Sequence, residues 1–290
     1  MPFQPSELVV NPNGSLYHIA LIPSQVHDTV IVVGDPGRVD LIASLCEEVK
    51  ETIHNREFYT KLVRHNGKDI TVMSTGIGTD NMDIAINELD AAVNIDLITR
   101  EVKEEKSSLD IIRLGTSGAL QEDIPVDTLV SSYYGLGLDG LLNFYDVDYT
   151  KEERSIRDAF IYDTGYPMTL SKPYVLESDL DLRLRIAPDL RSGITATACG
   201  FYGPQGRQLR IPLAHPDMNE RMTAFNYQDN QVINYEMETS ALYGLSRALG
   251  HKACTVCAVI ANRLRKEYSK DYKVTVRQMV GEVLERLTAH

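Results

Sequence analysis

Short apolar runs alternate with amphipathic stretches along this chain, and this alternation restricts its fold more than any other feature. The run Thr29–Val33 is β-branched and ends in a Gly/Pro turn, which is typical of a strand buried on both faces. Residues 111–114 and 254–260 form two more runs of this kind. Residues 115–118, Gly-Thr-Ser-Gly, follow the first of these two, and we interpret them as the turn that ends the strand.

Three other stretches have the periodicity of helices. Apolar side chains recur every three or four residues over residues 38–45, 82–93 and 276–287. Each stretch therefore predicts a helix with one buried face. Residues 101–108, by contrast, are mostly charged or polar and predict a solvated helix end or loop.

The pair Asn66-Gly67 stands between two predicted strands, residues 58–64 and 70–74, and is typical of a β-hairpin. A hairpin joins antiparallel strands, so the sheet is predicted to be mixed rather than purely parallel. Strands that alternate with helices indicate an α/β protein. We therefore expect a three-layer α/β sandwich with a mixed central sheet flanked by helices. No linker or repeat divides residues 1–290, which predicts a single domain.

The chain is acidic, with 29 Lys and Arg against 41 Asp and Glu and a formal net charge of −12. This charge repels phosphate backbones and anionic lipid, so we expect neither nucleic acid nor a membrane as partner. The longest apolar stretch, residues 253–261, is too short to span a bilayer. Four cysteines give no disulfide framework and the first residues lack a signal region, which favours a cytoplasmic location. An anionic ligand must therefore be bound by a few locally placed arginines.

Two glycine-rich segments are candidates for binding an anion, residues 34–38 and 113–118. In α/β sheets, ligands bind beyond the carboxyl ends of strands, where glycine turns expose backbone N–H groups. Neither segment matches the Walker or dinucleotide pattern, and each alone is equally well explained as an ordinary turn. Arg113 adds weight, because an arginine inside an apolar strand needs an anionic partner, either a structural carboxylate or a bound phosphate. Together with Arg38 and Arg56 it would hold one dianion.

Two further segments carry groups suited to a nucleoside. Phe201 offers a stacking face, Gln205 both donates and accepts, and Arg207 only donates, which matches the alternating edge of a pyrimidine. A Gly/Pro surface turn is the more common explanation of such a segment. Glu236 and Glu238 could accept hydrogen bonds from vicinal sugar hydroxyls, although solvated acidic residues at a helix start are the more ordinary explanation.

A metal site formed by His251, Cys254 and Cys257 is the remaining candidate. The two cysteines lie in an apolar run, and side chains three apart on a strand point to opposite faces. Core packing is therefore the favoured explanation, and no metal site is predicted.

Taken in order along the chain, these segments resemble the nucleoside phosphorylase-I family. The resemblance spans residues 17–263 and rests on six motifs, GDPGR at 34–38, REF at 56–58, STGIG at 74–78, RLGTSG at 113–118, FYGPQGR at 201–207 and NYEMET at 234–239. It implies reversible cleavage of uridine by inorganic phosphate to uracil and ribose 1-phosphate, a reaction of pyrimidine salvage. It implies no cofactor beyond phosphate as co-substrate.

The resemblance also implies roles for individual residues. It places phosphate on Gly34, Arg38, Arg113 and Thr116, joined by Arg56 from a neighbouring subunit. It places ribose on Glu236, Met237 and Glu238, joined by His18 of the neighbour at the 5′-hydroxyl. It places uracil on Phe201, Gln205 and Arg207. Gln205 and Arg207 would stabilise the charge that develops on uracil while Arg113 fixes the phosphate, in active sites shared between the subunits of a homo-oligomer.

Three alternatives to uridine cleavage stay open. A purine nucleoside phosphorylase of this family carries an aspartate where this chain has Ala261-Asn262. A nucleosidase of the same fold uses water and does not need three arginines on one dianion. A nucleoside-binding module without catalysis is weakened because each proposed group is of the required type. Some relatives also hold a monovalent cation with Glu57 and a serine, and Asn81 in place of that serine argues against the ion here.

Overall fold

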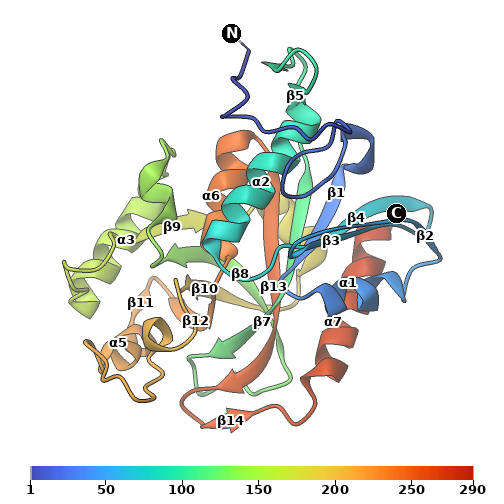
Figure 1. Ribbon diagram of the computed structural model, residues 1–290. Helices are drawn as coiled ribbons and strands as arrows, with labels where there is room; N and C mark the ends of the chain where they lie inside the picture. Colours follow the sequence, from blue (N-terminus) through green and yellow to red (C-terminus); the bar gives the residue numbers. More distant parts are fainter. Residues whose placement is uncertain (1, 290) are drawn as a thin grey trace.

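The computed structural model describes residues 2–289, and one mixed sheet forms its centre (Figure 1). Within those residues the sheet has 12 strands, in the order β11-β12-β10-β8-β13-β7-β1-β4-β3-β2, with β9 beside β8 and β14 beside β13. β1 pairs in parallel with β4 and β7, whereas β3 pairs antiparallel with β2 and β4. The predicted mixed sheet is therefore confirmed.

The elements follow one another in an alternating order. The strands are β1 (Thr29–Val33), β2 (Glu48–Asn55), β3 (Phe58–His65), β4 (Lys68–Ser74), β5 (Ile95–Asp96), β6 (Glu101–Val102), β7 (Asp110–Ala119), β8 (Leu129–Gly137), β9 (Tyr174–Glu177), β10 (Arg191–Thr197), β11 (Asn226–Tyr227), β12 (Asn230–Glu236), β13 (Lys252–Asn262) and β14 (Glu267–Tyr268). The helices are α1 (Pro36–Ala43), α2 (Thr79–Asn94), α3 (Lys151–Thr164), α4 (Leu180–Ile186), α5 (Met218–Ala224), α6 (Thr239–Leu249) and α7 (Tyr272–Thr288), with short 3₁₀ helices η1 (Pro23–Gln25), η2 (Leu141–Phe144) and η3 (Gly203–Gln205). None of these helices, all within residues 2–289, is long and apolar enough to cross a membrane.

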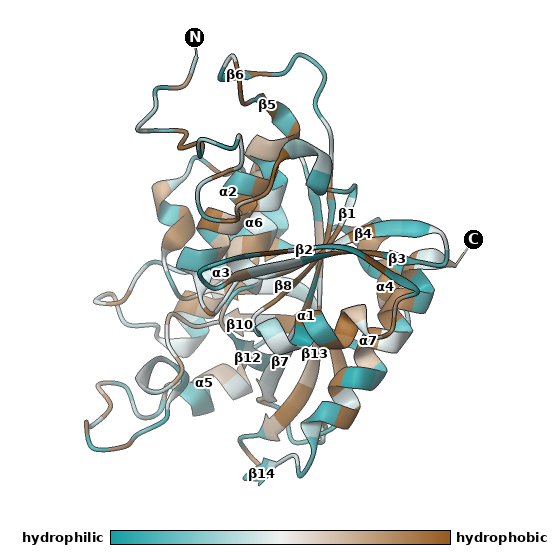
Figure 2. Cartoon of the chain, turned by 45° about the vertical axis from the view of Figure 1, so that its right-hand side comes forward, coloured by the Kyte–Doolittle hydropathy of each residue, from teal (hydrophilic) through white to brown (hydrophobic). Residues whose placement is uncertain are grey.

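Helices cover both faces of the sheet because its central strands are apolar on both. Along β1, Val30 and Val32 pack in one core cluster with α2 and α6. Ile31 and Val33 face the other way and pack with α1, α4 and α7. Figure 2 shows β13, most of whose residues are buried, as a largely apolar strand through the middle of the molecule. The expected α/β sandwich with helices on both faces is thus confirmed.

The turn predicted at residues 115–118 is wrong, because β7 continues through these residues to Ala119. β13 pairs in parallel along this stretch, and β12 pairs antiparallel with β7 at Gly118 and Ala119. Gly115 lets the Arg113 side chain approach the backbone closely, and it does not form a turn. A Cβ on Gly115 would lie 2.1 Å from Arg113 Nη1, so only glycine leaves room for the guanidinium over the strand.

The charged stretch 101–108 also differs in part from the prediction. Glu101 and Val102 form β6, which pairs with β5 in a separate two-stranded hairpin. The carboxylate of Asp96 closes the turn by accepting hydrogen bonds from the N–H groups of Ile98 and Thr99, both at 2.8 Å. Strands of two residues are too short for a hydrophobic pattern to reveal them.

Candidate active site

A cavity of about 820 Å³ opens where β1, β7 and β13 approach their carboxyl ends. The predicted site residues that line it are Gly34, Arg38, Arg113, Thr116, Phe201, Gln205, Arg207, Glu236, Met237 and Glu238. Segments separated by more than 200 residues thus contribute to one site. Only His18 and Arg56 of the predicted set lie elsewhere.

The amino end of α1 positions Arg38 at one end of this cavity. Asp35 caps the helix, because its carboxylate accepts a hydrogen bond from Gly37 N at 2.9 Å, and Pro36 occupies the first helical position. Arg38 Nη1 donates to the carbonyl of Leu114 at 2.9 Å. Burial, and then the charge of Arg113, lower the pKa of Arg38. The two guanidinium groups repel each other here, and an anion between them would relieve that repulsion.

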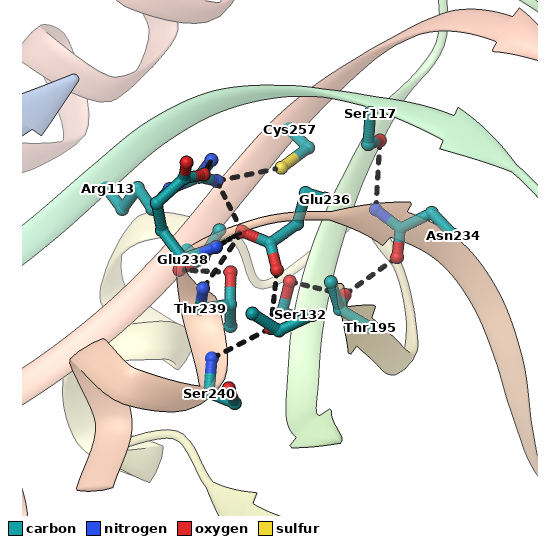
Figure 3. A network of polar contacts seen from close by, with 12 residues as sticks. Arg113, Ser117, Ser132, Thr195, Asn234, Glu236, Glu238, Thr239, Ser240 and Cys257 are labelled. Carbon is teal, nitrogen blue, oxygen red and sulfur yellow. Dashed lines mark hydrogen bonds and ion pairs between the residues drawn. The ribbon is translucent and has the colours of Figure 1, made fainter. Parts of the chain in front are cut away.

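Arg113 has the carboxylate partners that an arginine inside a strand requires (Figure 3). Its side chain is 6% exposed, with Nη1 3.2 Å from Glu236 Oε2 and Nη2 paired with Glu238 Oε2. Nη1 also donates to Cys257 Sγ at 3.4 Å. Burial works against the charge, but Glu238 and Glu236 outweigh it and raise the pKa of Arg113. Arg113 therefore stays protonated, and of the two partners that the sequence left open, the structure shows the structural carboxylates.

The base end of the cavity is built on η3 and the residues around it. Arg207 Nη1 donates to Gln205 Oε1 and to the carbonyl of Phe201, both at 2.7 Å. Its guanidinium lies 3.8 Å from the centre of the Phe201 ring. Burial, and then the charge of Arg263, lower the pKa of Arg207 to about 10. A fixed cation, an amide and an aromatic face therefore meet in one place, as the sequence predicted.

Arg263 is a cavity residue to which the sequence alone assigns no role. It lines the cavity, and its Nη2 donates to the carbonyl of Gln205 at 2.9 Å. Its Nη1 is buried and has no hydrogen-bond partner within residues 2–289. An arginine directly after the last buried strand was the available signal, but only the pairing of β13 with β7 shows that this strand ends at the site.

Asn262 lines the same cavity but directs its amide elsewhere. Its Nδ2 donates to the carbonyls of Gln121 and Ile124 at 2.8 and 2.7 Å, and its Oδ1 accepts from Arg265 N at 2.8 Å. The amide thus braces the loop after β7. Both of its N–H donors are engaged, and it offers no acid to a bound base.

His18 and Arg56 lie near each other, outside the cavity. His18 Nδ1 is 2.6 Å from Glu88 Oε1. Arg56 Nη2 donates to the hydroxyl of Tyr17 at 3.1 Å, and Asn55 Nδ2 donates to the carbonyl of His18 at 2.8 Å. The N-terminal segment and the β2–β3 turn therefore form a second polar surface, beside a separate hollow of about 450 Å³ that includes Arg56.

The candidate metal residues lie in β13 or directly before it and do not gather on one face of it. Cys254 packs with one core cluster and Cys257 with another, on opposite faces of the strand, as the alternation predicted. His251 Nδ1 accepts a hydrogen bond from Leu109 N at 3.1 Å. Within residues 2–289 no three His, Cys, Asp or Glu side chains gather in a group that could hold a metal ion.

Comparison with known proteins shows the family of this chain. The family described as the Phosphorylase superfamily matches residues 28–290. The chain is 33% identical over 274 residues to the uridine phosphorylase of Thermococcus kodakarensis, covering 92% of this chain and 85% of that protein. It is 27% identical over 245 residues to the guanosine phosphorylase of Halorubrum lacusprofundi, covering 84% of this chain and 83% of that protein.

A solved structure is similar over nearly the whole chain. It is a nucleoside phosphorylase of Trypanosoma brucei, described as showing uridine phosphorylase activity. It superposes with a TM-score of 0.89 at 27% identity, covering 98% of this chain and 100% of that one. This chain belongs to the phosphorylase superfamily.

Proposed function

We propose that this protein is a pentosyltransferase that catalyses the reversible phosphorolysis of uridine to uracil and ribose 1-phosphate. One observation carries the proposal: a single cavity holds an arginine pair for an oxyanion, a carboxylate for hydroxyls, and an amide with a guanidinium for a pyrimidine edge. Relatives that carry the name uridine phosphorylase support the same substrate. Because the site draws on residues from Gly34 to Arg263, we propose that the whole chain acts as one domain.

The proposed reaction needs positioning and charge stabilisation rather than a protein nucleophile. Arg38 and Arg113 hold phosphate against the anomeric carbon while the glycosidic bond breaks through an oxocarbenium-like centre. Gln205 and Arg207 stabilise the negative charge that develops on uracil. Because Gln205 Oε1 is already engaged by Arg207, its amide N–H₂ is the group that donates to a uracil oxygen.

We propose further that the active site is completed by a second copy of the chain. His18 and Arg56 stand outside the cavity of their own chain and close to one another. Two such chains, related by a two-fold axis, could each present this surface to the other's cavity. The partner's Arg56 would add a third guanidinium to the phosphate, and the partner's His18 would reach the sugar.

A purine nucleoside is the main alternative, since a guanosine phosphorylase is among the relatives. The position where an acid would protonate a purine ring is taken by Ala261-Asn262, and the Asn262 amide is engaged with Gln121 and Ile124. Uridine is therefore the better-supported substrate. Water in place of phosphate would leave the repulsion between Arg38 and Arg113 without an anion to relieve it.

Release of free base from a nucleoside panel tests the proposal. We expect uracil and ribose 1-phosphate from uridine with phosphate, and no uracil without it. Inosine and guanosine should react much more slowly. Uracil release in phosphate-free buffer would instead show a nucleosidase, and a uridine complex inert to phosphate would show a binding module.

Arg207→Ala separates the base end from the phosphate end. We expect it to lower kcat, because one preorganised donor to the developing charge is lost. The activation free energy should rise by about 3 kcal/mol. The KM for phosphate should barely change. Steady-state kinetics with varied phosphate measures both quantities, and an unchanged kcat would remove Arg207 from the site.

A further inference from the structure

Glu236 and Glu238 belong to one buried network, yet their carboxylates are engaged to different extents (Figure 3). Glu236 Oε1 accepts a hydrogen bond from Thr197 Oγ1 at 2.6 Å. Its Oε2 accepts from the N–H groups of Glu238 and Thr239 at 2.8 and 2.9 Å, and lies 3.2 Å from Arg113 Nη1. A carboxylate has about four acceptor positions. Three of its four donors therefore crowd Oε2, and Oε1 has one acceptor position beyond the one that Thr197 occupies.

Glu238, by contrast, has acceptor positions to spare. Its Oε1 accepts from Gly78 N at 2.7 Å, and its Oε2 is paired with Arg113 Nη2. By the same count about two positions remain. Glu238 lines the cavity just beyond the carboxyl end of β12. Its two remaining positions match the two vicinal hydroxyls of one ribose.

Arg113 is also only partly engaged. Its Nη1 donates to Cys257 Sγ and lies beside Glu236, and its Nη2 is paired with Glu238. A guanidinium has five N–H donors. About two of them, including the one on Nε, have no partner within residues 2–289 and remain for an oxyanion.

We propose that Glu236 binds no part of the substrate and is a positioning residue, which fixes Glu238 for both ribose hydroxyls and Arg113 for phosphate. This rests on the proposed phosphorolysis, and it changes the ribose-binding role that the family resemblance implies for Glu236. Glu236 contacts both the backbone N–H of Glu238 and the guanidinium of Arg113, so it ties the two subsites together. Its side chain is 1% exposed, and the oxygen with a spare acceptor position, Oε1, already lies against Thr197 Oγ1.

The test combines changes in the enzyme with changes in the substrate. Glu236→Gln and Glu238→Gln are each assayed with uridine, 2′-deoxyuridine and 3′-deoxyuridine. When a carboxylate accepts a hydrogen bond from a substrate hydroxyl, its substitution lowers kcat/KM less for a substrate that lacks that hydroxyl. For Glu238→Gln we expect the loss of kcat/KM to be smaller by about fivefold or more on at least one deoxynucleoside.

For Glu236→Gln the expectation differs. Its loss should shrink on the deoxynucleosides by clearly less than that of Glu238→Gln, because the contact of Glu238 to the hydroxyls is loosened rather than removed. The KM for phosphate should rise by about tenfold, because Arg113 loses its anchor. A loss that shrinks on either deoxynucleoside as much as that of Glu238→Gln overturns the proposal. Equal losses with an unchanged KM for phosphate also overturn it, since a merely structural defect lowers only the amount of active enzyme.

Thr197 provides a second pair of variants in case Glu236→Gln does not fold. Thr197→Val removes the hydroxyl that Glu236 Oε1 accepts and keeps the shape of the side chain. Thr197→Ser keeps the hydroxyl. The valine variant should raise the KM for phosphate, and the serine variant should stay within about twofold of wild type. Equal effects of the two variants would contradict the proposal.

Failure of the proposed function would give a separate result. If the wild-type protein leaves uridine intact in the presence of phosphate, the substrate is wrong. The role of Glu236 can then still be judged from thermal unfolding, because bound phosphate stabilises the folded state. Phosphate should raise the Tm of wild type more than that of Glu236→Gln. An equal shift in both proteins overturns the positioning role.

Discussion

A Cβ placed on Gly115 would lie 2.1 Å from Arg113 Nη1 and 2.8 Å from its Cζ. Residues 113 and 115 share one face of β7, so the arginine side chain folds back over the glycine. The guanidinium cannot move aside freely, because Glu236 and Glu238 hold it from the other side. The missing side chain at 115 thus sets the position of a charged group two residues away.

Gly115→Ala should therefore damage phosphate binding more than folding. We expect the KM for phosphate to rise by about tenfold, because the guanidinium must shift away from its carboxylates. Gly281→Ala in α7, outside the cavity, is the control, since a Cβ there would meet nothing within 4 Å. Steady-state kinetics and thermal unfolding of both variants check this. Equal phosphate KM values for the two variants would contradict the argument.

The amino end of α1 connects a helix cap to the phosphate end of the cavity. Asp35 accepts the Gly37 N–H and Arg38 follows in the first turn of the helix. The sequence predicted a helix over residues 38–45, and the structure starts it at Pro36 and ends it at Ala43. Proline at the first helical position and aspartate before it are start signals that the apolar spacing alone did not include.

Asp35→Ala should lower the free energy of unfolding by about 1 kcal/mol, because Gly37 N loses its acceptor at the helix start. Asp35→Asn keeps an acceptor at this position and should retain most of that stability. Urea unfolding followed by circular dichroism measures the difference between the two variants. A loss of similar size in both would show that the carboxylate charge, rather than the cap, stabilises this helix end.

At the same scale, the elements that local pattern predicted are those with a continuous apolar run, a helical apolar period or a clear turn signal. The strand at 29–33, the hairpin at Asn66-Gly67 and the C-terminal helix are all confirmed. The predicted Gly-Thr-Ser-Gly turn is wrong. Pairing with neighbouring strands extends β7 through glycines that, in the sequence, resemble a turn. Pairing between distant strands decides such cases, and no local window contains that information.

At the scale of the whole molecule, the placement of His18 and Arg56 defines what one chain lacks. Both lie on a surface outside the cavity, close to Tyr17 and Glu88. A site that lacks its third guanidinium within one chain is one that a symmetric partner could complete. The proposed assembly therefore makes a prediction about mixtures of inactive variants.

Arg56→Ala and Arg207→Ala should complement one another when the two proteins are unfolded and refolded together. A mixed dimer contains one intact site, with Arg207 from its own chain and Arg56 from the partner. Random pairing makes about half of the dimers mixed, so about one site in four is intact. Each variant refolded alone is the control, and uracil release is the measurement. Absence of any recovered activity in a refolded mixture would show that Arg56 serves its own chain.

The sequence by itself determined the layer structure and most chemical groups of the site. Apolar period and turn residues follow from local sterics and burial, and residue types name their own donors and acceptors. The tertiary structure alone decided how those groups are shared. It pairs Arg113 with two buried carboxylates, directs the Asn262 amide to backbone carbonyls, and places Arg263 in the cavity wall. These outcomes depend on contacts between segments more than 100 residues apart, which only the folded sheet brings together.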